Sequence, residues 1–101
     1  MGTTKTNLFD QQTNNVASIF KALAHPARIT IIQIINIAPK STGDLVAALG
    51  LKQSTVSEHL RILTNVGFIY PTSFGSSMVY SINYTAWHQM KINIEEFTVL
   101  M

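Results

Sequence analysis

Cysteine is absent from the 101-residue sequence. This absence excludes disulfide bonds, thiolate metal sites and redox sensing through cysteine. Apolar runs are short as well, and none approaches the ~18 residues that a membrane-spanning helix needs. The polar first residues lack the charged and apolar regions of a signal peptide. We therefore expect a cytoplasmic protein that does not enter a membrane.

Charge is also scarce. Charged residues make up 12% of the sequence and hydrophobic residues 47%, whereas about 25% of the residues of a typical protein are charged. A surface with few charges leaves apolar area to be covered, which favours an oligomer. The length indicates a single domain. The net charge of +2 is compatible with nucleic-acid binding but too small to argue for it alone.

Residue patterns that indicate catalysis are missing too. The sequence has no glycine-rich phosphate loop, no nucleophile placed beside a base and no acidic pair at a catalytic spacing. We therefore expect neither an enzymatic activity nor a cofactor.

The most informative stretch is LGLKQSTVSEHLRIL, residues 49–63. Its first three residues interrupt one helix, and the next helix carries Val56, Leu60 and Leu63 at i, i+4 and i+7. The opposite side of that helix carries short polar and charged side chains. This pattern is typical of the turn and recognition helix of a helix-turn-helix, whose polar side enters a DNA major groove.

Three helices are expected before the recognition helix. The first covers about residues 10–24 and follows residues 1–8, which we expect to be flexible. Residues 27–38 are rich in isoleucine, which favours a strand. However, Thr30, Gln33 and Asn36 recur every three residues, so we predict a buried helix that begins at Pro26 and ends before Pro39. Ser41 or Thr42 caps the third helix, and Gly50 ends it.

The period changes to that of strands after Gly67. Residues 68–70 and 78–82 are rich in β-branched and aromatic residues, and residues 73–77 between them have turn chemistry. We therefore predict a β-hairpin, the wing, within residues 68–83, and a last helix from about residue 86 to residue 100. The predicted fold is mainly α, a winged helix-turn-helix of about five helices and a two-stranded wing, with the helix-turn-helix in residues 41–66.

Three strings of the sequence carry a resemblance to a known family. They are ALAHPAR at residues 22–28, STGDLVAALGLKQSTVSEHLRILTNVGFI at residues 41–69 and VYSI at residues 79–82. Together they resemble the ArsR-type winged-helix repressors, and the resemblance covers residues 20–84. It implies a homodimer in which the first and last helices pair, a DNA operator as partner, and an inducer that lowers the affinity for DNA.

The sequence departs from this family at its inducer sites. Many members bind metal through Cys-x-Cys, where this chain has Ser41 and Gly43, and neither is a soft ligand. Other members have Asp-x-His and a second His eleven residues later in the last helix. Here Ala86 precedes His88 and Val99 follows it, so we expect no metal site and the inducer stays unknown. The wing residues 72–77 contain no Arg or Lys, which leaves hydroxyls and backbone amides for phosphate contacts.

The polar side of the recognition helix is the predicted DNA-binding site. Its first turn could simply cap the helix, but the hairpin that follows favours DNA contact. Glu58 can accept from cytosine or remain a solvated charge, and His59 can donate to a phosphate or remain a surface histidine. Arg28 is either a phosphate contact or a salt-bridge partner of Asp44, and His25 is most simply a helix cap. The predicted DNA-binding residues are Lys52, Gln53, Ser54, Thr55, Ser57, Glu58, His59 and Arg61, with Ser73 and Ser76 in the wing.

The first and last helices, in residues 9–24 and 86–101, are the predicted dimerisation helices. Their apolar stripes supply the predicted dimer interface: Val16, Ile19, Phe20, Leu23, Trp87, Met90, Ile94 and Phe97. We expect a sequence-specific transcriptional regulator, a dimeric repressor on a palindromic double-stranded DNA operator. The alternative is a winged-helix module that has lost DNA binding and binds other proteins, which the uncharged wing and the low overall charge favour.

Overall fold

The computed structural model describes residues 8–99 and 101. In this part of the chain five helices and three strands follow one another: α1 (Gln11–Leu23), α2 (Pro26–Ile37), β1 (Lys40–Ser41), α3 (Thr42–Leu49), α4 (Gln53–Asn65), β2 (Ile69–Phe74), β3 (Ser77–Ile82) and α5 (Tyr84–Thr98). The predicted winged helix-turn-helix is confirmed. We expected residues 1–8 to be flexible. Residues 1–7 lie outside the described part of the chain, and so does residue 100 of the last predicted helix.

Side-chain caps fix the starts of four helices. The capping side chains accept a hydrogen bond from the first turn of α1, α2, α3 and α5, and they are Asp10, His25, Ser41 and Asn83. At α3 the Ser41 hydroxyl accepts from the Asp44 N–H while the Asp44 carboxylate accepts from the Ser41 N–H. Such reciprocal caps satisfy backbone donors that have no partner inside the helix.

The isoleucine-rich segment forms helix α2, as predicted. Ile31 and Ile35 lie four residues apart on the buried side of this helix and are almost fully covered. Gln33 and Asn36 are exposed on the other side, and the half-buried Thr30 donates its hydroxyl hydrogen to the Pro26 carbonyl one turn earlier. The spacing of polar residues therefore decided the structure here, and the strand propensity of isoleucine did not.

Helices α3 and α4 form the helix-turn-helix. Gly50 ends α3 in the left-handed conformation, with φ at 68°, which suits glycine because a side chain is strained there. Leu45 of α3 and Val56, Leu60 and Leu63 of α4 are buried. The two helices thus bury their apolar sides in one core, and the polar side of α4 stays outside.

The sheet has one strand more than the predicted two. β2 and β3 pair antiparallel in a hairpin, with Ile69 opposite Ile82 and Phe74 opposite Ser77, and β1 pairs with β3 on the other side. The strand order is therefore β1-β3-β2. The predicted turn at residues 73–77 was too long, because Ser73, Phe74 and Ser77 belong to the strands. A strand as short as Lys40–Ser41 has no alternating pattern that would reveal it in the sequence.

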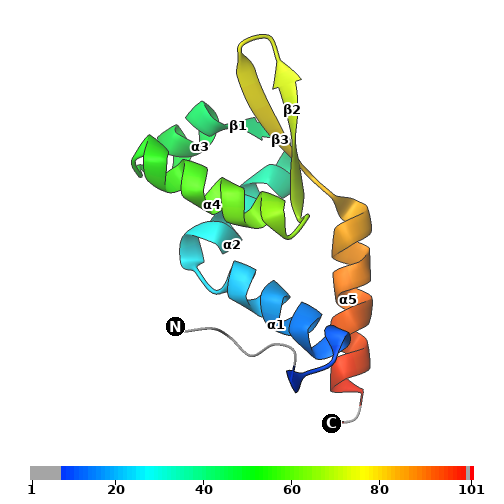
Figure 1. Ribbon diagram of the computed structural model, residues 1–101. Helices are drawn as coiled ribbons and strands as arrows, with labels where there is room; N and C mark the ends of the chain where they lie inside the picture. Colours follow the sequence, from blue (N-terminus) through cyan, green and yellow to red (C-terminus); the bar gives the residue numbers. More distant parts are fainter. Residues whose placement is uncertain (1–7, 100) are drawn as a thin grey trace.

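One hydrophobic core joins the helices to the base of the wing. Its most buried members come from α2, α3, α4 and β2: Ile31, Ile35, Leu45, Val56, Leu60, Leu63 and Ile69. In Figure 1 the β2–β3 hairpin projects beyond the helices, and α1 and α5 make up the opposite part of the molecule. Across residues 8–99 and 101, no helix has the length and apolar character needed to cross a membrane.

Candidate nucleic-acid interface

The exposed side of α4 carries the polar residues of the predicted site. Helix periodicity places Gln53, Ser54, Ser57, Glu58 and Arg61 within about half of its circumference, and all five are exposed. Thr55 is exposed in the first turn as well. Because Val56, Leu60 and Leu63 fix the other side of the helix in the core, the polar side is rigidly presented to solvent. Such a surface has the dimensions and hydrogen-bonding groups to enter a major groove.

The N-terminus of α4 differs from those of the other helices. Lys52, at the N-cap position, makes no side-chain capping hydrogen bond within residues 8–99 and 101. The first N–H groups of a helix have no partner inside it, and together with the helix dipole they attract anions. The ammonium group of Lys52 adds positive charge at the same place. This end of α4 is therefore suited to a DNA phosphate.

Arg61 is paired with Glu58 on the same side of α4. The Arg61 Nε atom donates to Glu58 Oε1 at 2.8 Å, and Nη2 donates to Oε2 at 2.5 Å. These hydrogen bonds lower the pKa of Glu58 and raise the pKa of Arg61. Both side chains are more than half exposed, at 57% for Arg61 and 55% for Glu58, so a phosphate can reach the guanidinium but must compete with the carboxylate.

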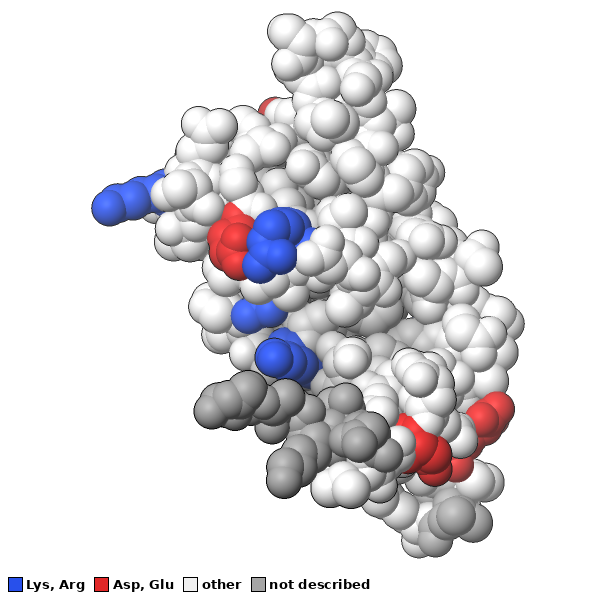
Figure 2. All heavy atoms as spheres, in the orientation of Figure 1, with Lys and Arg blue, Asp and Glu red and all other residues white. Residues whose placement is uncertain are grey.

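Two further cations lie next to Arg61. Lys21 of α1, Arg28 of α2 and Arg61 line one groove of about 400 Å³. The Nε atom of Arg28 is buried and finds no hydrogen-bond partner in the described part of the chain. Its alternative partner, Asp44, instead accepts a hydrogen bond from the Ser41 N–H. Figure 2 shows Lys and Arg side chains gathered over α4 and the helices beside it, while most of the acidic side chains visible there lie near the end of α5.

Lys21 was not among the residues predicted from the sequence. It is separated from the helix-turn-helix in the chain and reaches the groove only because α1 packs beside α4 in the fold. A sequence pattern cannot show such a crossing of helices. The only sequence signal was the position of Lys21 near the end of the first helix, three residues after another polar residue, Ser18.

His59 does not lie on the exposed side of α4, which corrects its predicted phosphate contact. Its exposed fraction is 8%, and its ring lies 4.5 Å from the ring of His25, measured between centroids. Its Nδ1 atom has no hydrogen-bond partner among residues 8–99 and 101. Burial, followed by the nearby His25 and Arg28, lowers the pKa of His59. His59 therefore packs α4 against the start of α2.

The wing is exposed and carries no charge. Ser73 and Ser76, the predicted contacts, lie on its surface, and the whole sequence from residue 62 to residue 90 has no Asp, Glu, Lys or Arg. Its most exposed large side chain is Phe74, with an exposed fraction of 76%. The wing can therefore offer hydroxyls, backbone N–H groups and one aromatic ring, but no ionic contact to phosphate.

The predicted dimer residues divide into two groups in the single chain. Val16, Ile19 and Met90 are buried, and Leu23, Trp87 and Ile94 pack against the core. Phe20 and Phe97 stay exposed, at 47% and 44%, and their rings meet edge to face at 6.5 Å between centroids. The two exposed rings are available to a second chain, whereas the buried residues mainly hold α1 and α5 in place.

No cluster of three His, Asp or Glu side chains that could hold a metal ion occurs in the described ranges. His25 and His59 lie close together without a third ligand in those ranges, and the Nδ1 atom of His25 already accepts from the Ala27 N–H at 3.0 Å.

Comparison with known proteins agrees with this geometry. Residues 25–70 match the family of bacterial regulatory proteins described as the arsR family. The chain is 33% identical to the HTH-type transcriptional regulator YgaV of Escherichia coli over 67 residues, which covers 65% of this chain and 68% of YgaV. The chain belongs to the ArsR family. It is also 40% identical over 75 residues, 74% of its length, to the HTH-type transcriptional regulator NmtR of Mycobacterium tuberculosis.

The match to NmtR spans only 62% of the length of that protein. Among solved structures, this ArsR-family chain resembles the homodimeric winged helix-turn-helix DNA-binding domain of Mb0332 from Mycobacterium bovis. The TM-score is 0.72 at 20% identity, over 91% of this chain and 84% of the Mb0332 chain. At that identity the likeness supports the fold alone.

Proposed function

We propose that the protein is a sequence-specific DNA-binding transcriptional regulator, and that α4 is its recognition helix. The observation that carries the proposal is the exposed polar side of α4, which lies beside the groove lined by Lys21, Arg28 and Arg61. A helix with small hydrogen-bonding side chains in front and cations at its flank combines base recognition with phosphate binding.

The side chains of α4 divide between these two tasks. Gln53 has the amide that can bind adenine through two hydrogen bonds, and Ser54 and Ser57 can donate or accept at several bases. Lys52 and the first turn of α4 bind one phosphate, and the three cations of the groove bind the backbone that follows. Ser73 and Ser76 contribute neutral contacts from the wing. With a neutral wing, α4 and the groove supply most of the affinity for DNA.

The working form is a homodimer built from α1 and α5. Phe20 and Phe97, together with Val16 and Ala17, line a groove of about 430 Å³ between these two helices. Exposed aromatic side chains at such a groove are the usual centre of a protein interface. The DNA-binding domain of Mb0332 is described as homodimeric, in keeping with a dimer here. Two-fold symmetry would present two copies of α4 to a palindromic operator, with half-sites about 34–36 Å apart.

A regulator of this kind acts on the chromosome, in the cytoplasm of a bacterial cell, and has no enzymatic activity. Repression is the expected outcome, since a dimer seated on an operator blocks access to the promoter. The relatives are named as regulators, in keeping with this proposal.

Binding to a pool of genomic fragments at low salt, followed by sequencing of the retained DNA, tests the proposal. We expect a palindromic site, lost on Gln53→Ala, and weaker binding to all DNA on Arg61→Gln. Glu95→Gln, on α5 away from this surface, is the control. The proposal is wrong if the intact dimer retains no DNA, or if Gln53→Ala changes neither affinity nor the selected sequence.

A second candidate function is a protein-interaction module. It is favoured by the wing, where Tyr70, Phe74 and Met78 are exposed and no charge is present. Exposed apolar side chains on a hairpin suit a protein partner. The same experiment separates the two functions, because an interaction module would retain no specific DNA whatever the state of Gln53.

A further inference from the structure

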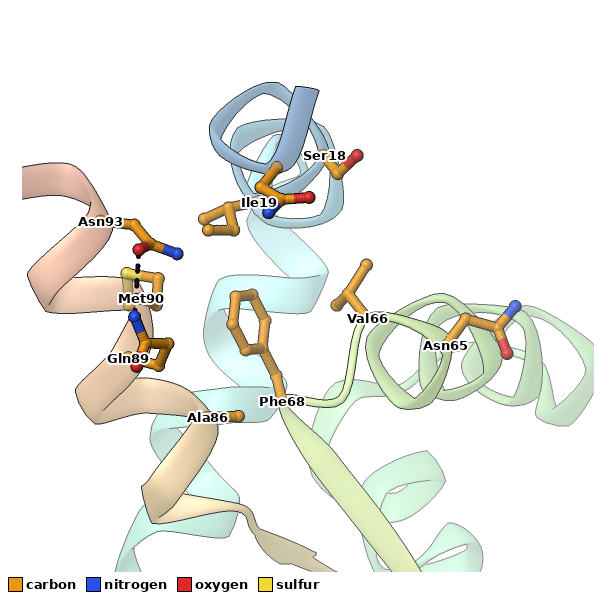
Figure 3. A pocket seen from close by; sticks show the side chains of 10 residues that line it. Ser18, Ile19, Asn65, Val66, Phe68, Ala86, Gln89, Met90 and Asn93 are labelled. Atoms are coloured by element: carbon orange, nitrogen blue, oxygen red, sulfur yellow. Dashed lines mark hydrogen bonds between the residues drawn. The ribbon is translucent and has the colours of Figure 1, made fainter. Parts of the chain in front are cut away.

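A pocket of about 410 Å³ lies where α1, the end of α4 and α5 meet. Figure 3 shows Phe68 at its centre, with Ile19 pointing toward it from α1, Met90 from α5 and Val66 from the end of α4. The volume lies within the ~300–1,000 Å³ that is usual for small-molecule sites. The full lining is Asn15, Ser18, Ile19, Asn65, Val66, Phe68, Ala86, Gln89, Met90 and Asn93.

The floor of the pocket is apolar and firmly held. Ile19, Phe68 and Met90 all belong to the buried core. The ring of Phe68 stacks against Trp87, with 4.6 Å between centroids and 30° between planes. The indole N–H of Trp87 also donates to the Phe68 carbonyl at 3.1 Å. A flat apolar ligand would therefore meet a preformed surface, which lowers the entropy lost on binding.

The rim is polar but carries no charge, since its hydrogen-bonding groups are the amides of Asn15, Asn65, Gln89 and Asn93 and the Ser18 hydroxyl. The Gln89 Nε2 atom donates to Asn93 Oδ1 at 3.1 Å (Figure 3). This bond uses one donor of Gln89 and one acceptor lone pair of Asn93. It leaves the Gln89 carbonyl oxygen as an acceptor and the Asn93 NH₂ group as a donor on the same rim of the pocket.

We propose that this pocket binds an uncharged ring compound that carries an N–H next to a carbonyl, as in a cyclic amide. The N–H of the ligand donates to Gln89 Oε1 and its carbonyl accepts from Asn93 Nδ2, while the ring enters the pocket against the apolar side chains of its lining. A charged ligand is disfavoured, because the lining offers no opposite charge to offset the loss of hydration.

The location of the pocket makes its occupant a regulator of α4. Asn65 and Val66 end α4, and Ile19 and Met90 belong to the helices proposed for dimerisation, so a ligand here contacts both. A ligand that fits one relative position of α4 and α1 better than another shifts the protein toward it. This regulatory part rests on the proposed DNA binding, whereas the binding of the ring compound does not.

The test uses the dimer and three probes of similar size: 2-quinolone, its N-methyl derivative without the N–H, and the anion 2-naphthoate. Trp87 is the only tryptophan, so its indole N–H gives one reporter signal in a ¹⁵N NMR spectrum. We expect saturable shifts with 2-quinolone and at least about tenfold weaker binding of the other two, the ratio expected for one lost buried hydrogen bond.

Two variants and one control locate the binding. Asn93→Leu removes the hydrogen-bond donor for the ligand carbonyl, and Ser18→Phe narrows the mouth of the pocket from an exposed position. Each variant should therefore weaken the binding of 2-quinolone at least about tenfold. Glu95→Gln, on the same helix but outside the lining, should leave it unchanged. The proposal fails if all three probes bind alike, if none binds, or if both variants bind 2-quinolone as the parent does.

DNA affinity measured with and without saturating 2-quinolone tests the regulatory part. A change in affinity that Asn93→Leu abolishes supports it, and an unchanged affinity in the presence of bound 2-quinolone overturns it. A protein that binds 2-quinolone but no DNA would refute the proposed function and leave the ligand site intact.

Discussion

The competition between Glu58 and DNA for Arg61 can be tested with a single substitution. Glu58→Gln keeps the size of the side chain and removes its charge. In the present structure the carboxylate holds two nitrogens of the Arg61 guanidinium, and DNA phosphates near this surface are repelled by Glu58. We therefore expect Glu58→Gln to bind DNA more tightly at low salt than the parent protein.

The salt dependence gives the size of the effect. Each phosphate neutralised by a cation adds about 0.9 to the slope of log K against log salt concentration. A dimer has two copies of Arg61, so their full release adds up to about 1.8. Between 50 and 200 mM salt, a fourfold change, Glu58→Gln should then lose up to about 12-fold more affinity than the parent.

Fluorescence anisotropy with a labelled operator at four or five salt concentrations measures both quantities. Glu95→Gln is the matched control, because it removes the same charge on α5. The Glu58–Arg61 pair is exposed and exposed pairs contribute little to stability, so both variants should unfold at the parent temperature. If Glu58→Gln weakens binding and leaves the slope unchanged, Glu58 contacts a base and the reasoning on competition is wrong.

Three further predictions follow from other parts of the fold. Burial, followed by the nearby His25 and Arg28, lowers the pKa of His59, so its contribution to stability is complete above about pH 6.5 and decreases as the pH falls below that value. Between pH 8 and pH 5 the melting temperature should therefore fall less in His59→Phe than in the parent protein. Parallel curves of melting temperature against pH would exclude His59 as the cause. Ser41→Ala removes the cap of α3 and should lower the free energy of unfolding in urea by about 1 kcal/mol, with Ser41→Thr close to the parent. Phe74→Arg places a cation on the neutral wing and should raise DNA affinity and the salt slope; no change in either would show that the wing stays away from DNA.

The fold could be predicted largely because its elements carry local signals. Ser41 and Gly50 mark helix ends by their own chemistry, and the polar residues of α2 recur with a helical period. β1 could not be predicted, since pairing with β3 depends on where α2 delivers the chain. The length of the hairpin strands was misjudged because Ser73 and Ser77 have turn chemistry but pair within the ladder.

The candidate site shows the same limit. The exposed residues of α4 follow from the spacing of Val56, Leu60 and Leu63. His59 lies three residues after Val56 and four before Leu63, which places it on the apolar side of the helix, but its polar ring suggested the surface. The groove lined by Lys21, Arg28 and Arg61 depends on how three helices cross, and such tertiary contacts have no local signal.

The open first turn of α4 also affects how the protein searches for its site. A helix end without a side-chain cap leaves its first backbone N–H groups to solvent in the free protein. A DNA phosphate that binds this end takes the place of the absent cap. During sliding along non-specific DNA that phosphate is exchanged continually, and only an arrest at the operator keeps it in place. The N-terminus of α4 is thus completed by a phosphate at each contact with DNA, and for longest at the operator.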